Sequence, residues 1–68
     1  MMIKREDVRR MKIVAEQIAN AKSEYQIHTI EMSFIDLMSD RYGKDKAKEL
    51  LVNVWNMSKL VKTSSLKV

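Results

Sequence analysis

The one histidine of the chain, His28, is followed three residues later by Glu31. On a helix this spacing places both side chains on one face, where they could form a hydrogen-bonded pair. Acid–base catalysis would also need a nucleophile or a second positioned carboxylate, and the sequence contains no cysteine. A closed metal site would need more ligands than one imidazole and one carboxylate. We therefore expect no catalytic residue, no metal site, no cofactor and no enzymatic activity.

Two further carboxylates, Asp36 and Asp40, lie one helical turn apart. Such a pair holds a hydrated cation weakly at best, and a solvated helix face is the simpler interpretation. The sequence also has no glycine-rich phosphate loop, nucleophile elbow or HExxH segment. The residue types present therefore favour a binding function over a catalytic one.

Lysines recur at helical spacing in the last third of the chain, with the single tryptophan between them. Such lysines could contact phosphates along a nucleic acid without reading its sequence. The plainer alternative is that they flank a core and lay their apolar stems along it. A second basic cluster lies near the N-terminus. The candidate nucleic-acid residues are Arg5, Arg9, Lys12, Lys44, Lys48, Trp55, Lys59 and Lys62.

The charges are distributed in blocks. Lysine and arginine number 13 against 9 acidic residues, for a formal charge of +4. Residues 1–12 and 44–68 are net basic, whereas residues 13–43 are net acidic. Such a pattern can satisfy itself within one chain or across a dimer, or it can present two basic ends to a polyanion.

The 68 residues include no proline and one glycine, which argues against tight β-hairpins and favours an all-α fold. The length predicts one domain over residues 1–62. We expect a small three-helix bundle with a tight hairpin between its second and third helices and a flexible C-terminal tail. The predicted segments are helices at about 5–21, 25–42 and 45–62 and a tail at 63–68.

Apolar residues recur at helical spacing on each predicted helix. The apolar arcs of the first two helices differ in direction by about 140°, so one straight helix cannot present both to one core. A single long helix whose halves contact different chains stays open as an alternative. The predicted core consists of Val8, Met11, Val14, Ala15, Ile18, Ala21, Tyr25, Ile27, Ile30, Phe34, Leu37, Met38, Ala47, Leu50, Leu51, Val54, Met57, Ser58 and Val61.

Local signals mark the break between the first two helices. Ser23 followed by Gln26 matches a capping box, which would begin the second helix. Asn20 is a residue type that can end a helix in the left-handed conformation. We therefore predict the break near residues 21–25.

Other signals mark the remaining helix ends. Asp7 is predicted as the N-cap of the first helix or as an acid in its first turn. Gly43 follows the second apolar arc, where a helix-ending glycine belongs, and Asp45 then reads as the N-cap of the third helix. The short connection at Gly43 resembles a helix-turn-helix in outline, although Lys44 and Glu49 stand where that motif carries apolar residues.

Several apolar residues fall outside the three arcs, which indicates a second buried surface. A chain this short gains burial by associating, so we expect a homodimer or a protein partner. The predicted interface residues are Ile13, Met32, Ile35, Val52 and Leu60.

The expected function is that of a small non-enzymatic regulatory module that binds proteins. A DNA-binding regulator is the alternative, and a small-molecule substrate or a membrane partner is not expected. The N-terminal residues lack the apolar stretch of a secretory signal, and no apolar run approaches a membrane span. A cytoplasmic location is expected on these grounds.

Overall fold

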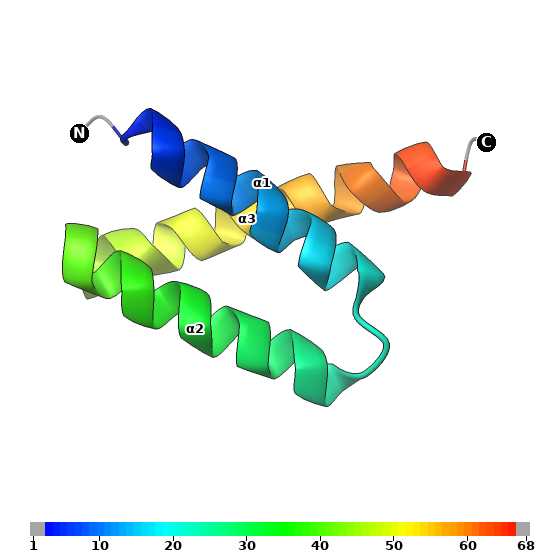
Figure 1. Cartoon of the computed structure of the whole chain (residues 1–68), viewed down its shortest axis with the longest axis horizontal. Coiled ribbons are helices and arrows are strands. Elements are labelled where there is room, and N and C mark those ends of the chain that lie inside the picture. Colours follow the sequence, from blue (N-terminus) through cyan, green and yellow to red (C-terminus); the bar gives the residue numbers. More distant parts are fainter. Residues whose placement is uncertain (1–2, 67–68) are drawn as a thin grey trace.

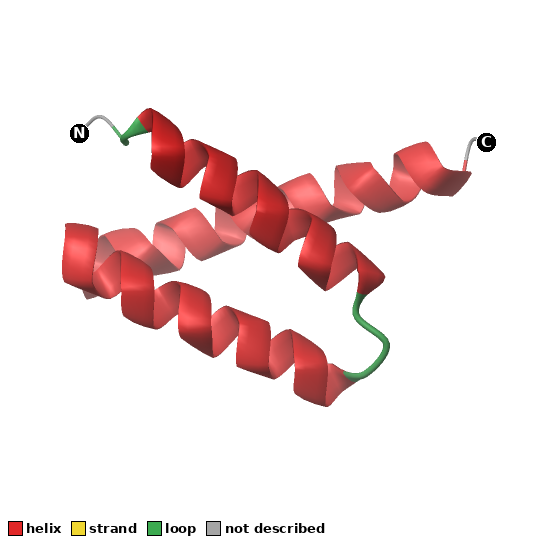
Figure 2. Ribbon diagram, in the orientation of Figure 1, coloured by secondary structure: helices red, strands yellow, loops and turns green. Residues whose placement is uncertain are grey.

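The chain was described with a computed structural model, which covers the backbone of residues 3–66 and the side chains of residues 3–61. It consists of three helices, α1 (Arg5–Asn20), α2 (Glu24–Tyr42) and α3 (Lys44–Leu66) (Figures 1 and 2). The described residues contain no strand. The predicted all-α, three-helix fold is confirmed, and the first two helices are separate.

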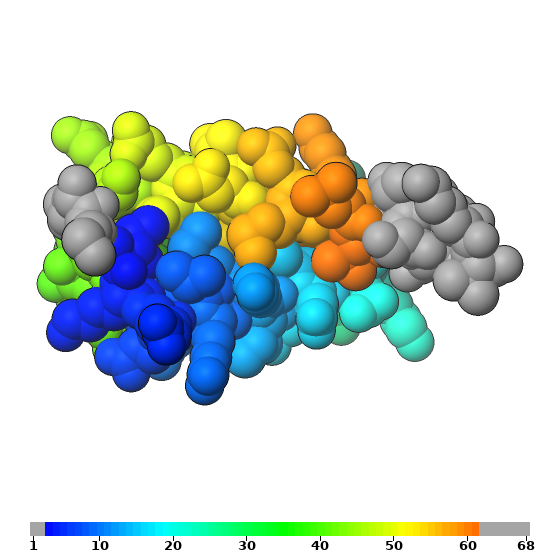
Figure 3. Space-filling model, turned by 90° about the horizontal axis from the view of Figure 1, so that it is seen from above, coloured from blue at the N-terminus to red at the C-terminus, as the bar shows by residue number. Residues whose placement is uncertain are grey.

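The helices form two layers. Helices α1 and α2 lie in front in Figure 1, and α3 runs behind them, from the C-terminal end of α2 across the back of α1. Seen from above in Figure 3, α1 in blue and cyan occupies one side and α3 in yellow and orange the other. Each front helix packs extensively on α3, whereas α1 and α2 meet only sparsely. Helix α3 is therefore the support that positions the other two.

The break between α1 and α2 has the predicted capping mechanism. The Ser23 hydroxyl oxygen accepts a hydrogen bond from the Gln26 backbone N–H at 3.2 Å, and the Gln26 side chain accepts one from the Lys22 N–H at 2.8 Å. The prediction for Asn20 was wrong, because this residue stays inside α1. The helix closes instead at Ala21, whose extended backbone leads the chain out without a left-handed residue.

Gly43 joins α2 to α3 in one residue. Its N–H donates to the Ser39 carbonyl at 2.9 Å, and its own carbonyl accepts from the Ala47 N–H at 3.0 Å. Its φ of 90° and ψ of 159° belong to a region open essentially to glycine alone. The tight hairpin is therefore confirmed, and its sharpness depends on a glycine at this position.

The third helix differs from the prediction at both ends. It begins at Lys44, so Asp45 lies in the first helical turn and is not the N-cap that the sequence suggested. A carboxylate there still faces the positive end of the helix dipole. The helix continues to Leu66, past the predicted end at residue 62, because no glycine or proline interrupts residues 62–66. The backbone of residues 63–66, assigned to a tail in the prediction, is thus helical.

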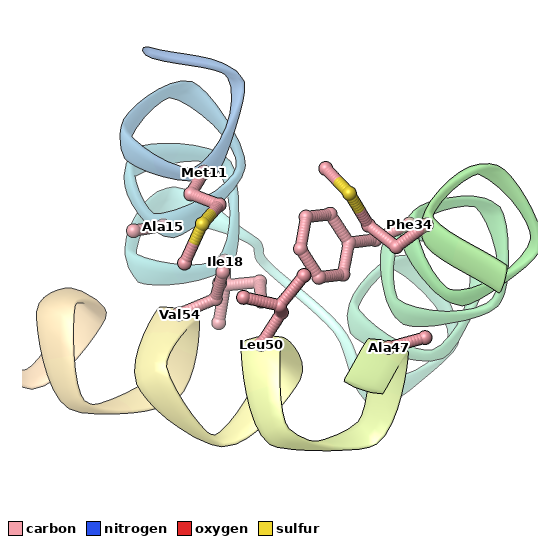
Figure 4. Close-up of a cluster of buried hydrophobic side chains, with 8 residues drawn as sticks. Met11, Ala15, Ile18, Phe34, Ala47, Leu50 and Val54 are labelled. Carbon is pink, nitrogen blue, oxygen red and sulfur yellow. The ribbon is translucent and has the colours of Figure 1, made fainter. Parts of the chain in front are cut away.

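The core lies where the two layers meet (Figure 4). Leu50, at the centre, lies between Met11 of α1 and Phe34 of α2. Two residues of the predicted core, Val8 and Tyr25, are instead 38% and 79% exposed. Val8 lies near the start of α1, and Tyr25 lies in the first turn of α2, past the break that ends the first helix. The buried hydrophobic residues, all within the predicted arcs, are Met11, Ala15, Ile18, Phe34, Met38, Ala47, Leu50 and Val54.

Candidate interaction surfaces

The residues with possible acid–base or metal chemistry do not converge. His28 is exposed. The Glu31 carboxylate accepts a 2.6 Å hydrogen bond from the indole N–H of Trp55, which draws Glu31 toward α3. Within residues 3–61, histidines and carboxylates form no group of three that could hold a metal ion.

A buried polar cluster joins the start of α1 to the end of α2. The Asp7 side chain is fully buried, and its Oδ2 accepts hydrogen bonds from the Tyr42 hydroxyl at 2.5 Å and from Arg41 at 3.3 Å. Glu6 lies 4.0 Å from the same guanidinium, and the Lys4 N–H donates to the Tyr42 oxygen at 3.2 Å. Asp7 therefore lies in the first turn of α1, one of its two predicted places, and fastens the two front helices at one end.

This cluster makes the stability of the fold depend on pH above neutrality. The hydrogen bond from the Tyr42 hydroxyl to Asp7 raises the pKa of Tyr42 above its usual value of 10.0. Only the neutral phenol can donate this bond, so its contribution to stability is complete below pH 10.0 and disappears as the pH rises through the folded-state pKa. Tyr42→Phe should therefore destabilise the fold at pH 8, and the difference from the wild type should shrink toward zero above pH 10.0.

Urea unfolding of both proteins from about pH 8 to pH 11 measures this difference. Tyr25→Phe is the matched control, because Tyr25 is 79% exposed. A stability difference for Tyr42→Phe that stays constant across the range would contradict the assignment of the hydroxyl as the donor.

The predicted basic band of α3 is only partly an open surface. Lys44, Lys48 and Lys59 are exposed, but Trp55 is half-buried against the core and is hydrogen-bonded to Glu31. An acidic group thus stands within the band, and the indole is not free to stack on bases. The side chain of Lys62 lies outside the described residues.

The N-terminal basic residues Arg5, Arg9 and Lys12 are all exposed on α1. Their spacing places them on the side of α1 that faces away from α2. They and the α3 lysines therefore do not belong to the surface between α1 and α2.

The predicted interface residues do not form one patch. Ile35 packs partly buried against the core, because its side of α2 faces α3. Ile13 and Met32 are exposed on the front layer, at 56% and 52%. Val52 and Leu60 are exposed on α3, and Val52 lies about 200° around the helix from the buried Leu50. The two layers thus separate the predicted surface into parts.

The structure instead shows an apolar groove between α1 and α2, on the face away from α3. Two adjoining hollows of about 230 and 430 Å³ share Gln17, Thr29 and Ile30 as lining residues. The α1–α2 groove exists because the front helices pack on α3 more than on each other. Its lining consists of Arg10, Val14, Gln17, Asn20, Ala21, Tyr25, Gln26, Thr29, Ile30, Ser33, Phe34 and Leu37.

The two edges of the α1–α2 groove carry opposite charge. Arg10 lines the groove from α1. On α2, Asp36 follows the lining residue Ser33 by three positions, and Asp40 follows Leu37 by three, so both carboxylates continue along the groove edge. Among the described side chains, no ion pair involves these three charged residues.

Sequence reasoning missed the α1–α2 groove because it assigned Val14, Ile30 and Leu37 wholly to the core. These three residues are half-buried and line the groove. The signal was the width of the apolar arcs on the first two helices, which exceeds what contact with a single neighbouring helix covers.

Comparison with known proteins gives no relative: no family model, no curated protein and no solved structure matches the chain. None of the helices in the described part of the chain is both long and apolar enough to cross a membrane.

Proposed function

We propose that this protein is a non-enzymatic interaction module that regulates by binding protein, and that it binds through the α1–α2 groove. The observation that carries the proposal is the groove itself, an apolar surface that is exposed between α1 and α2 because both helices pack on α3. Groove-shaped apolar surfaces with polar edges are the usual seats for a helix from another protein. The proposal places the module inside the cell, working as a homodimer or with a protein partner.

The composition of the α1–α2 groove favours the binding of another protein over the binding of a small molecule. Its hollows are open to solvent, and the half-buried apolar side chains of Val14, Ile30 and Leu37 line them. At the connection between the helices, Tyr25 contributes an aromatic side chain that is 79% exposed. Exposed tyrosines of this kind are enriched among the residues that dominate binding energy in protein interfaces.

A site-specific crosslinker tests this proposal in the native cells of the protein. A photoreactive amino acid in place of Thr29 would sit in the groove, whereas the same residue in place of Asn56 would sit on the exposed surface of α3. We expect protein adducts in several-fold excess from position 29. Equal yields at both positions, or no adduct from position 29, would contradict the proposal.

DNA binding is the second candidate, and one observation favours it. The exposed side chains of Lys44, Lys48 and Lys59 follow one side of α3. Titration of the protein into labelled mixed-sequence duplex DNA at low salt, read as the fluorescence anisotropy of the DNA label, tests it. Tight binding that weakens steeply with salt and is lost in Lys48→Glu with Lys59→Glu would replace the protein-binding proposal. An unchanged anisotropy at low salt would remove this candidate.

A further inference from the structure

We infer that the occupant of the α1–α2 groove is a second copy of this chain, placed face to face so that α1 of each copy lies over α2 of the other. This inference rests on the proposed function and names its partner. It concerns the front layer of the molecule and not the off-arc residues of α3.

The first argument is the shape of the face. Helices α1 and α2 are side by side in Figure 1, and nothing in the described chain covers them on the side away from α3. When two such faces meet, four helices enclose the apolar strip from both sides, as in a four-helix bundle. The residues that would become buried in the centre are Val14, Ile30 and Leu37 from each copy.

The second argument is charge complementarity, and it also fixes the arrangement. Arg10 and Leu37 line the same hollow, so Arg10 stands near the level of Asp36 and Asp40 along the groove. A twofold axis parallel to the groove places the α1 edge of one copy over the α2 edge of the other. Each Arg10 then meets the two carboxylates of its partner copy, twice per dimer by symmetry.

The alternative face-to-face arrangement is disfavoured by the same charges. A twofold axis across the groove would place α1 over α1 and α2 over α2. This axis also reverses the direction of the groove, so Arg10, Asp36 and Asp40, which lie toward one end of it, would lie at opposite ends in the two copies. No Arg10 would then meet a carboxylate of the partner copy, and the charge complementarity would be lost.

The area of the face formed by α1 and α2 sets the expected affinity of the dimer. Helix α1 has 16 residues, which gives a face about 24 Å long, and two helices side by side are about 20 Å wide. Each copy therefore offers roughly 500 Å², and a total of about 1,000 Å² lies at the low end of specific interfaces. We expect reversible dimers that form in the micromolar range and dissociate on dilution.

Charge reversal tests both the partner and the arrangement. Arg10→Glu should weaken self-association by about tenfold or more, as should Asp36→Lys with Asp40→Lys, because each variant opposes like charges across the interface. An equimolar mixture of the two variants should recover dimers. Both groove edges of Arg10→Glu are acidic and both edges of the double lysine variant are basic, so each edge meets an edge of opposite charge. Sedimentation equilibrium from about 10 μM to about 1 mM gives the masses.

The controls separate a local from a general effect of charge. Lys12→Glu changes the net charge by the same amount as Arg10→Glu, but Lys12 lies about 200° around α1 from Arg10. It should leave the dissociation constant within about threefold of the wild type. Far-ultraviolet circular dichroism establishes that each variant retains its helices, and recovery in the mixture shows that both variants fold.

A wild-type protein that stays monomeric at about 1 mM would overturn the inference. So would an Arg10→Glu variant with the same average mass as the wild type at every concentration, or an equimolar mixture of the two variants that forms no dimers. These failures are distinguishable from failure of the proposed function. A monomeric wild type whose position 29 crosslinks to a different protein retains the groove as a binding site and loses only the second copy as its occupant.

Discussion

Leu50→Ala should lower the free energy of unfolding by about 3 kcal/mol, enough to unfold most of a domain this small at 37 °C. Leu50 is fully buried and lies between Met11 of α1 and Phe34 of α2, so its loss leaves a cavity against both front helices. Because α3 is the only element in the described part of the chain that packs extensively on both, neither front helix can close the gap by moving toward the other. Urea denaturation followed by circular dichroism measures the change.

Leu60→Ala provides the matched control on the same helix. The chemical change is identical, but Leu60 is 67% exposed, so the free energy of unfolding should move by no more than about 0.5 kcal/mol. Similar decreases in the free energy of unfolding for both variants would mean that the side of α3 that faces α1 and α2 has been assigned incorrectly.

Arg41→Met should be destabilising by about 2 kcal/mol. The guanidinium lies 3.3 Å from the fully buried Asp7 carboxylate, and its removal leaves a buried charge whose remaining hydrogen bond among the described residues comes from Tyr42. Breaking a wholly buried ion pair costs about 3–5 kcal/mol. The smaller value is expected because 34% of the Arg41 side chain is exposed and water already screens the pair.

The second-site variant distinguishes this mechanism from a loss of packing. Asp7→Asn combined with Arg41→Met removes the uncompensated charge, so it should be more stable than Arg41→Met alone by about 1 kcal/mol. Arg9→Met is the control for removing an exposed arginine and should have little effect. A double variant that is no more stable than Arg41→Met would contradict an uncompensated buried charge as the cause of the destabilisation.

The helices and their connections could be predicted because their signals are local. The Ser23–Gln26 pair lies within one turn, and Gly43 marks a backbone conformation that other residues avoid. The apolar arcs also identified every buried hydrophobic residue of the core. These features depend on neighbours a few positions away, which is the range over which periodicity is informative.

The polar contacts between helices could not be predicted in this way. Asp7 and Tyr42 are 35 positions apart, and Trp55 finds Glu31 at a separation of 24. Periodicity places a residue on a face of its own helix but does not say which helix that face will meet. Asp7 was therefore predicted only as an N-cap or a first-turn acid, and its burial against the end of α2 could not be predicted.

The α1–α2 groove could not be predicted for the same reason. An apolar arc shows which side of a helix is buried, but it does not show that α1 and α2 would both pack on α3 and leave a groove between them. Ile35 illustrates the consequence, because it lies outside the predicted arc yet packs against the core beside α3. The predicted dimer surface mixed front-layer residues such as Ile13 with back-layer residues such as Val52.

The most direct test of the α1–α2 groove as the binding face is a dilution series of isotope-labelled protein followed by amide NMR. From about 1 mM to about 20 μM, the resonances of groove residues such as Gln17, Thr29 and Ile30 should move with concentration, whereas those of Val52 and Asn56 on α3 should stay fixed. Concentration-dependent shifts confined to α3, or a spectrum unchanged over the whole series, would contradict a self-complementary face between α1 and α2.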